Sequence, residues 1–282
     1  MTGAVLSPAS ATRVTLRDRI DGMPTWAGAV TGVVAILVIW WVASLVLFQR
    51  SQAIPHPPEV FAYLFSGSTW SDTLHNLGGT VPAAAQGFLW GNVVALLLAG
   101  VVLLLPQIEA VATQIAIVTY CLPLVAIGPI LVIVAVRMNK LEAPSIVLAA
   151  LSVFFTTVVG ALLGLRAAPR TSMDVIMAYG GTRFTALRKV QLISALPNLF
   201  AALKIAAPAA FLGAVLAEYL GSGGDASLGR ALIAAQSNAD GPLLWYLALI
   251  SGAVAGLGYF LIGLVGRLVT PWSSGSTAGA RP

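Results

Sequence analysis

Charged residues are scarce in this 282-residue sequence: Asp, Glu, Lys and Arg make up only 9% of it, whereas hydrophobic residues make up 58%. Soluble domains carry roughly 25% charged residues. The composition therefore excludes a soluble domain and indicates a protein embedded in a lipid bilayer. The net charge of +5 does not indicate nucleic-acid binding, because the basic residues lie in short segments between long apolar runs.

Groups that carry catalysis or bind metals are also scarce. The single cysteine, Cys121, lies inside an apolar run, which excludes a disulfide framework and a cysteine-based metal site. The two histidines, His56 and His75, lie in one segment, and the sequence has neither His-Glu-x-x-His zinc spacing nor a Gly-x-x-x-x-Gly-Lys phosphate loop. Gly221-Ser222-Gly223-Gly224 lacks a following Lys and is typical of a turn. We therefore predict no enzyme, with no catalytic residue, metal or cofactor in this chain.

Long apolar runs are what the sequence does contain, and about 20 such residues suffice for a membrane-spanning helix. The first run, 26–48, exceeds the apolar stretch of about 7–15 residues in a secretory signal and lacks an Ala-x-Ala cleavage site, so we predict a retained span. Pro123 and Pro129 are expected to kink the third run. The predicted fold is all-α, a polytopic membrane protein of about six transmembrane helices, with a transmembrane domain at 25–270 between tails at 1–24 and 271–282. The spans are placed at about 25–48, 81–105, 110–136, 143–165, 198–221 and 242–269.

The distribution of Lys and Arg predicts the orientation, because basic residues collect in cytoplasmic loops. With the N-terminus inside, the cytoplasmic segments would hold Arg13, Arg17, Arg19, Arg166, Arg170, Arg183, Arg188, Lys189, Arg267 and Arg281. The outer segments would hold Arg50, Arg137, Lys140 and Arg230. Both termini are therefore predicted to be cytoplasmic.

Residues 166–197 form a polar, basic segment between two apolar runs, and such a segment cannot lie in lipid. The paired glycines Gly180 and Gly181 predict a turn, since only glycine readily adopts positive φ. Polar groups for docking and apolar anchors for a partner's groove flank that turn: Asp174, Arg183, Arg188 and Lys189 among the former, and Ile176, Tyr179, Phe184 and Leu187 among the latter. We interpret the segment as a helical element presented to a soluble partner. The alternative is a plain loop whose basic residues only set the topology.

The segment resembles the loop by which permease subunits of bacterial ABC importers dock onto their ATPase. That loop reads Glu-Ala-Ala, three residues, Gly, nine residues, then Ile-x-Leu-Pro. Asp174 stands at the Glu position, Gly180 matches the Gly, Val190 stands at the Ile position and Leu192 matches the Leu. Val175, Ile176 and Ile193 depart from the Ala-Ala and the Pro.

Further pieces, spread over roughly residues 25–270, resemble the nitrate, sulfonate and taurine branch of these permeases, which includes relatives that handle thiamine-precursor pyrimidines. In chain order they are Ile54-Pro55-His56-Pro57-Pro58-Glu59-Val60, the run from Leu122 to Pro129, Phe154-Phe155 with Gly164-Leu165-Arg166, Ala195-Leu196-Pro197, and Ala217-Glu218-Tyr219-Leu220-Gly221 with Leu228-Gly229. The chain departs from the branch at Arg137-Met138-Asn139 and at Thr156.

The resemblance implies a permease with the type I ABC importer fold in a bacterial cell membrane. Its implied partners are a cytoplasmic ABC ATPase dimer, a second permease copy or a paralogous permease, and an extracytoplasmic substrate-binding protein. ATP and Mg would be bound by the ATPase. The implied cargo is a nitrate-, sulfonate- or taurine-like anion or a thiamine-precursor-like pyrimidine. The alternative function is an ATP-independent secondary transporter or channel subunit, which would show inverted repeats with broken helices.

Two charged residues, Lys204 and Glu218, lie within or at the end of the fifth apolar run. Ionisable groups in a membrane usually face protein or water, because lipid solvates them poorly. They are 14 residues apart, which places them about 21 Å apart on nearly one helix face. One interpretation is a pathway lined by Lys204, Pro208, Phe211 and Glu218. The alternative is that Lys204 extends to the cytoplasm and Glu218 to the outer interface.

Overall fold

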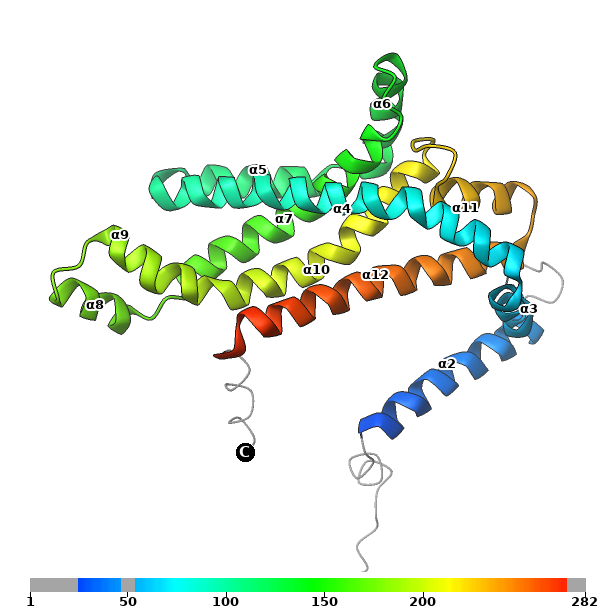
Figure 1. Cartoon of the computed structure of the whole chain (residues 1–282), viewed down its shortest axis with the longest axis horizontal. Coiled ribbons are helices and arrows are strands. Elements are labelled where there is room, and N and C mark those ends of the chain that lie inside the picture. The colour runs from blue at the N-terminus through cyan, green and yellow to red at the C-terminus, as the bar shows by residue number, and fades with distance from the viewer. Residues whose placement is uncertain (1–24, 47–53, 273–282) are drawn as a thin grey trace, which may run out of the picture. The chain divides into compact units, whose positions relative to one another are not determined.

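The computed structural model describes residues 25–46 and 54–272, and all regular structure in these residues is helical (Figure 1). Residues 1–24, 47–53 and 273–282 lie outside the described residues, and with them most of the two predicted tails. Arg13, Arg17, Arg19, Arg50 and Arg281, which contribute to the predicted orientation, lie there too. The chain divides into two units, residues 1–60 and 61–282.

The first unit contains one long apolar helix, α2 (Thr25–Val46), and most of the short helix α3 (Pro57–Ala62). The 22 residues of α2 rise about 33 Å, enough to cross the hydrocarbon core. Near its end, Trp40 Nε1 donates to the carbonyl of Pro55 at 3.2 Å, and Ser44 Oγ lies 2.9 Å from His56 Nδ1. These bonds hold the proline-rich segment against the end of α2.

The second unit contains the other predicted spans (Figure 1). In chain order its elements are η1 (Tyr63–Phe65), α4 (Gly67–Leu104), η2 (Pro106–Ile108), α5 (Glu109–Cys121), α6 (Leu124–Arg137), α7 (Ala143–Arg166), α8 (Arg170–Ala178), α9 (Arg183–Ala186), η3 (Leu187–Gln191), α10 (Leu192–Tyr219), α11 (Leu228–Ser237) and α12 (Gly241–Val269). Within the described residues, five helices are long and apolar enough to cross a membrane, or six if the bent pair α5–α6 is one span.

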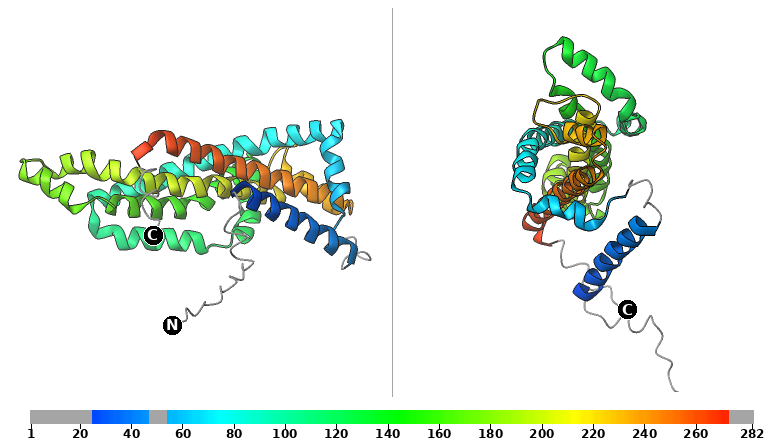
Figure 2. Two further views of the ribbon diagram at one scale, coloured as in Figure 1. Left: turned by 90° about the horizontal axis from the view of Figure 1, so that it is seen from below. Right: turned by 90° about the vertical axis from the view of Figure 1, so that its right-hand side faces the viewer.

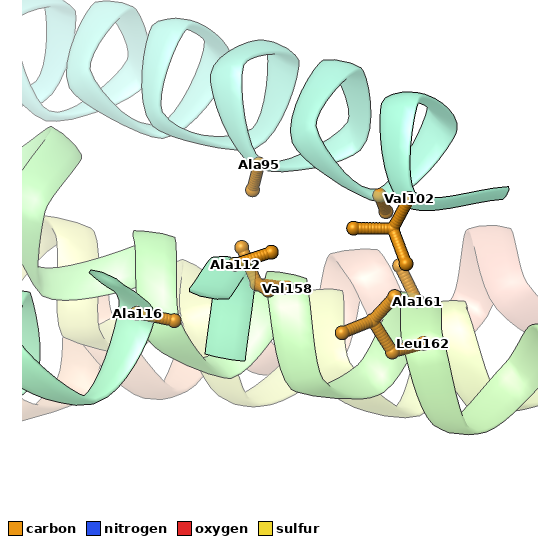
Figure 3. Close-up of a cluster of buried hydrophobic side chains, with 8 residues drawn as sticks. Ala95, Val102, Ala112, Ala116, Val158, Ala161 and Leu162 are labelled. Carbon is orange, nitrogen blue, oxygen red and sulfur yellow. The ribbon is translucent and has the colours of Figure 1, made fainter. Parts of the chain in front are cut away.

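Small residues let the central helices α4, α7 and α10 approach one another closely. A Cβ added to Gly91 of α4 would lie 2.6 Å from the carbonyl oxygen of Ala150 on α7. A Cβ added to Gly213 of α10 would lie 2.9 Å from the carbonyl oxygen of Leu148 on the same helix α7. Alanines dominate the neighbouring cluster between α4, α5 and α7, as Figure 3 shows for Ala95, Ala112, Ala116 and Ala161. Close van der Waals packing is the main force that joins helices in lipid.

The predicted positions of the second, fourth, fifth and sixth spans are confirmed, with different starts for two of them. The second, α4, begins at Gly67 rather than about 81 and continues through Pro82 as one helix of 38 residues. Its length of about 57 Å exceeds a hydrocarbon core of about 30 Å, so it extends beyond the core. The fifth, α10, begins at Leu192 rather than about 198, and Pro197 lies inside it.

The third span differs from the prediction of one kinked helix. The helix breaks between Cys121 and Leu124, and α5 and α6 meet at a bend of 85°. Pro123 has no N–H to donate and takes an extended conformation at the N-cap of α6, which ends the hydrogen-bond ladder there. Pro129 lies inside α6 without ending it. As a result α6 stands away from the layer of α4, α7 and α10 in Figures 1 and 2.

Candidate functional site

The segment that we expect to dock an ATPase contains the short helix α8, which ends in a glycine-based turn. Gly180 has φ of +75° and its N–H donates to the carbonyl of Met177 at 3.0 Å. The N–H of Gly181 donates to the carbonyl of Ile176 at 2.8 Å. This pair of bonds is the Schellman motif, in which glycine ends a helix through the left-handed conformation.

The two glycines serve this turn for different reasons. The expectation of positive φ is confirmed for Gly180 and wrong for Gly181, which does not have positive φ. A Cβ at Gly181 would instead lie 2.7 Å from the carbonyl oxygen of Ile176 and 2.4 Å from its Cγ2. Gly180 thus meets a conformational requirement and Gly181 a steric one.

The segment after the turn is continuous with a membrane span. Thr182 Oγ1 accepts a hydrogen bond from the N–H of Thr185 at 3.3 Å, which caps the start of α9. α9 passes through the π-helical turn η3 into α10, so residues 184–219 form one helical stretch of 36 residues. A displacement of α9 therefore moves the adjoining end of α10 directly.

Large apolar side chains project from the docking segment, defined here as residues 170–191. Tyr179 is 89% exposed and Phe184 is 68% exposed. Asp174, Arg188 and Lys189 are also exposed, whereas Ile176 and Leu187 are half-buried. Val175 and Met177 are exposed as well. Exposed apolar patches rimmed by polar residues mark protein–protein contacts, whereas single exposed apolar side chains do not. The side chain of Arg183 lies outside the described residues.

A groove of about 590 Å³ separates the docking segment from the ends of α4 and α7. Its walls are mostly apolar and include Val102, Leu103, Leu104, Leu162, Leu165, Met173, Met177, Phe184 and Leu187. At its rim Arg166 pairs with Glu109, which joins the end of α7 to the start of α5. Beside this groove, the docking segment contacts the bundle mainly through η3, which packs against α10 and α7.

Lys204 is half-buried near the middle of the long helical stretch 184–219. Its Nζ lies 4.2 Å from the ring centroid of Tyr259 on α12, a cation–π arrangement. Gly263 provides the room, since a Cβ there would lie 3.0 Å from Lys204 Cε. In the part of the chain that the structure describes, the ion pairs are Arg166–Glu109 and Arg230–Asp225, and neither includes Lys204.

The other pathway candidates have different surroundings. Pro208 lies half-buried inside α10, and Phe211 is only 5% exposed. Glu218 is 2% exposed and accepts hydrogen bonds from Thr80 Oγ1 at 2.8 Å and from the N–H of Gly229 at 3.1 Å. The structure does not bring Glu218 and Lys204 together. The pathway role of these residues stays a prediction, and the contacts of Glu218 favour a positioning role.

Several buried polar contacts were not found from the sequence. Thr157 Oγ1 on α7 donates to Asn92 Oδ1 on α4 at 2.5 Å. Outside the spans, Tyr63 donates to Asp240, and burial together with this carboxylate raises the pKa of the tyrosine. Asp240 also caps α12 by accepting from the N–H of Leu243. An Asp before Gly-Pro is a recognisable helix start, but its partner 177 residues away has no local signal.

Comparison with known proteins gives a consistent result. Residues 91–274 match the family model described as "Binding-protein-dependent transport system inner membrane component". A probable ABC transporter permease protein of Haemophilus influenzae is 30% identical over 82% of this chain and 91% of its own length. The riboflavin transport system permease protein RibX of Chloroflexus aurantiacus is 27% identical, with 85% and 88% covered. The formylaminopyrimidine transport permease protein ThiX of Halalkalibacterium halodurans is 22% identical, with 84% and 92% covered.

Two solved structures share the fold. One is an amino acid ABC transporter crystallised with histidines, with a TM-score of 0.57 and 18% identity over 71% of this chain and 96% of that chain. The other is the MetNI methionine ABC transporter in an inward-facing conformation, with a TM-score of 0.52 and 20% identity over 71% and 95%. The expected type of membrane fold is thereby confirmed.

Proposed function

From the premise that this chain belongs to the family of binding-protein-dependent transport system inner membrane components, and is the permease subunit of an ABC importer, we propose that it imports a small nitrogen heterocycle. Permease subunits of this kind are not themselves enzymes. ATP hydrolysis is therefore the task of a separate ATPase, and the cargo is presented by a substrate-binding protein. The permease works as a pair, either with a second copy or with a paralogous chain.

The docking segment is continuous with α10, and this observation carries the docking part of the proposal. Tyr179 and Phe184 are the apolar anchors that would enter a groove on the ATPase, and Asp174, Arg188 and Lys189 would pair with polar groups around it. When the two ATPase subunits close on ATP, the paired docking segments would move together. The attached α10 helices would then turn the bundle toward the outer side.

The cargo class is supported by two relatives that match more than four fifths of this chain. One is named for riboflavin and the other for formylaminopyrimidine, and both compounds are nitrogen heterocycles. A second cargo, a nitrate-, sulfonate- or taurine-like anion, is favoured by one observation. Lys204 is a half-buried cation near the middle of a span, and an anion in the pathway would neutralise it.

Uptake into proteoliposomes tests the cargo. The complete complex of permease pair, ATPase and binding protein would be supplied with ATP on the ATPase side and with labelled formylaminopyrimidine, riboflavin, taurine or nitrate on the other side. We expect ATP-dependent uptake of at least one heterocycle. Uptake of taurine or nitrate alone would show that the cargo is an anion and not a heterocycle. Uptake that persists without ATP would instead support a secondary transporter.

Cysteine labelling in intact cells tests the orientation. In a variant whose exposed Cys121 is replaced by serine, new cysteines at Ser68, Ser237 and Thr182 would all lie at exposed positions. We expect an impermeant thiol reagent to label the first two and to label Thr182→Cys only after the cells are opened. Labelling of Thr182→Cys alone in intact cells would reverse the predicted orientation and place the docking segment outside, away from any cytoplasmic ATPase.

A further inference from the structure

The carboxylate of Glu218 is the centre of a buried hydrogen-bond cluster that joins three helices. It lies at the end of α10, and one of its oxygens accepts both from Thr80 Oγ1 of α4 and from the N–H of Gly229 in α11. Thr80 is fully buried, and its Oγ1 also accepts from the N–H of Leu228 at 3.0 Å. Two side chains from two spans thus bind the first turn of α11.

This cluster completes the N-terminal cap of α11. The first N–H groups of a helix have no partner within the helix. Here the N–H of Leu228 donates to Thr80, that of Gly229 to Glu218 and that of Arg230 to Ser227 Oγ at 3.3 Å. The acceptor oxygen of Glu218 also lies at the positive end of the helix dipole, which favours an acceptor there. The start of α11 is therefore attached to α4 and α10 through the first two of these donors and to its own loop through the third.

The connecting loop, residues 220–227, and the start of α11 pack closely against α4 and α10. A Cβ at Gly229 would lie 2.4 Å from Glu218 Cβ, and one at Gly79 would lie 1.9 Å from the carbonyl oxygen of Ala226. Gly223 has φ of +91°, and its N–H donates to the carbonyl of Leu141 at 2.9 Å. The loop, α11 and the adjoining parts of α4 and α10 consequently form one compact block.

α11 lies at the opposite end of the bundle from α8 and α9, as Figures 1 and 2 show. Its inner side buries Leu228, Gly229 and Ala235, whereas Arg230, Gln236 and Ser237 are exposed. α10 is the one element in the described part of the chain that contacts α11 and also continues into the docking segment. α11 is bonded to α10 at two places: the N–H of Gly229 donates to the buried Glu218, and Tyr219 Oη donates to Gln236 Oε1 at an exposed position.

We propose that Glu218 is a positioning residue through which α11, contacted on its exposed polar side by the substrate-binding protein, controls α10 and hence the ATPase. The inference rests on the proposed function, since it requires a binding protein on one side and an ATPase on the other. Thr80 is the second residue of this link, because its Oγ1 bonds both Glu218 and the N–H of Leu228. The exposed polar side chains of α11 that face the binding protein in this proposal are Arg230, which pairs with Asp225, and Gln236, whose Oε1 accepts from Tyr219.

The test compares Thr80→Val, which removes the hydroxyl at nearly constant shape, with Thr80→Ser, which keeps it. The complete complex in proteoliposomes would be assayed for ATP hydrolysis with and without the binding protein. We expect Thr80→Val to keep the basal rate but to lose about fivefold or more of the stimulation by the binding protein. Thr80→Ser should retain the stimulation. Glu218→Leu, which removes the oxygen that accepts both bonds, decides the question if Thr80→Val does not assemble, and it should also lose stimulation.

Thr157→Val is the matched control, because Thr157 is equally buried and hydrogen-bonded between α4 and α7 but does not contact α11. It should lower thermal stability without changing the stimulated-to-basal ratio. Equal ratios in Thr80→Val, Glu218→Leu and wild type would overturn the inference. Reduced uptake of cargo with unchanged stimulation in Glu218→Leu would also overturn it and support the pathway role. Failure of the proposed function can be distinguished from failure of this inference, because the wild-type complex itself would then show no stimulation by the binding protein.

Discussion

Replacing Gly180 with valine should abolish ATP-driven transport while the membrane bundle remains folded. Gly180 has φ of +75°, and a β-branched residue in that conformation is strained by roughly 1–3 kcal/mol. The strain is relieved if the turn after α8 opens, which displaces Tyr179 and Asp174 from their positions on the docking segment. We therefore expect co-elution of the ATPase with the detergent-solubilised permease to fall about fivefold or more, since about 1 kcal/mol corresponds to a factor of about five.

Asparagine variants separate the conformational requirement at Gly180 from the steric one at Gly181. Asparagine adopts the left-handed conformation more readily than other non-glycine residues, so Gly180→Asn should retain most ATPase binding. Gly181→Asn should lose it, because any Cβ at this position approaches the carbonyl oxygen of Ile176 to 2.7 Å. Normal ATPase binding by both Gly180→Val and Gly181→Asn would show that the ATPase docks elsewhere.

Several parts of this fold could be predicted because their signals are local. Apolar runs specify the spans, and the polar segment with Gly180 specifies a helix that ends in a left-handed turn. The family resemblance assigns a docking role to that turn, and this role stays a prediction. The separate steric role of Gly181 has no local signal, because it depends on where the side chain and carbonyl of Ile176 lie.

Other features depend on contacts between distant residues and could not be predicted. The short helix α11 lies in a segment rich in turn residues, and its start is capped by Thr80, 148 positions away from Leu228. Thr80 also contacts Glu218. From the sequence alone, the side chain of Glu218 could either line a pathway or extend to the outer interface. A kink was expected at Pro123, but proline alone does not specify whether a helix bends slightly or breaks at 85°.

Replacing Gly91 with leucine should destabilise the helix bundle strongly. A Cβ at this position would lie 2.4 Å from Val153 Cγ2, 2.6 Å from the carbonyl oxygen of Ala150 and 2.9 Å from its Cα. Two of these atoms belong to the backbone of α7, so a change of rotamer cannot remove the clash. α4 and α7 would have to separate along their contact, and we expect a loss of about 3 kcal/mol or more in the free energy of unfolding.

Gly100→Leu is the matched control for this substitution. Gly100 lies on the same helix α4, but a Cβ there would have no atom within 4 Å. Both substitutions add the same apolar side chain, so they favour membrane insertion equally and differ only in what the side chain meets. Thermal unfolding of the purified chain in detergent, followed by loss of the monodisperse chromatographic peak, should therefore show a much lower midpoint for Gly91→Leu only. Equal midpoints for the two variants would contradict the contact between α4 and α7, on which the placement of α10 and of the docking segment depends.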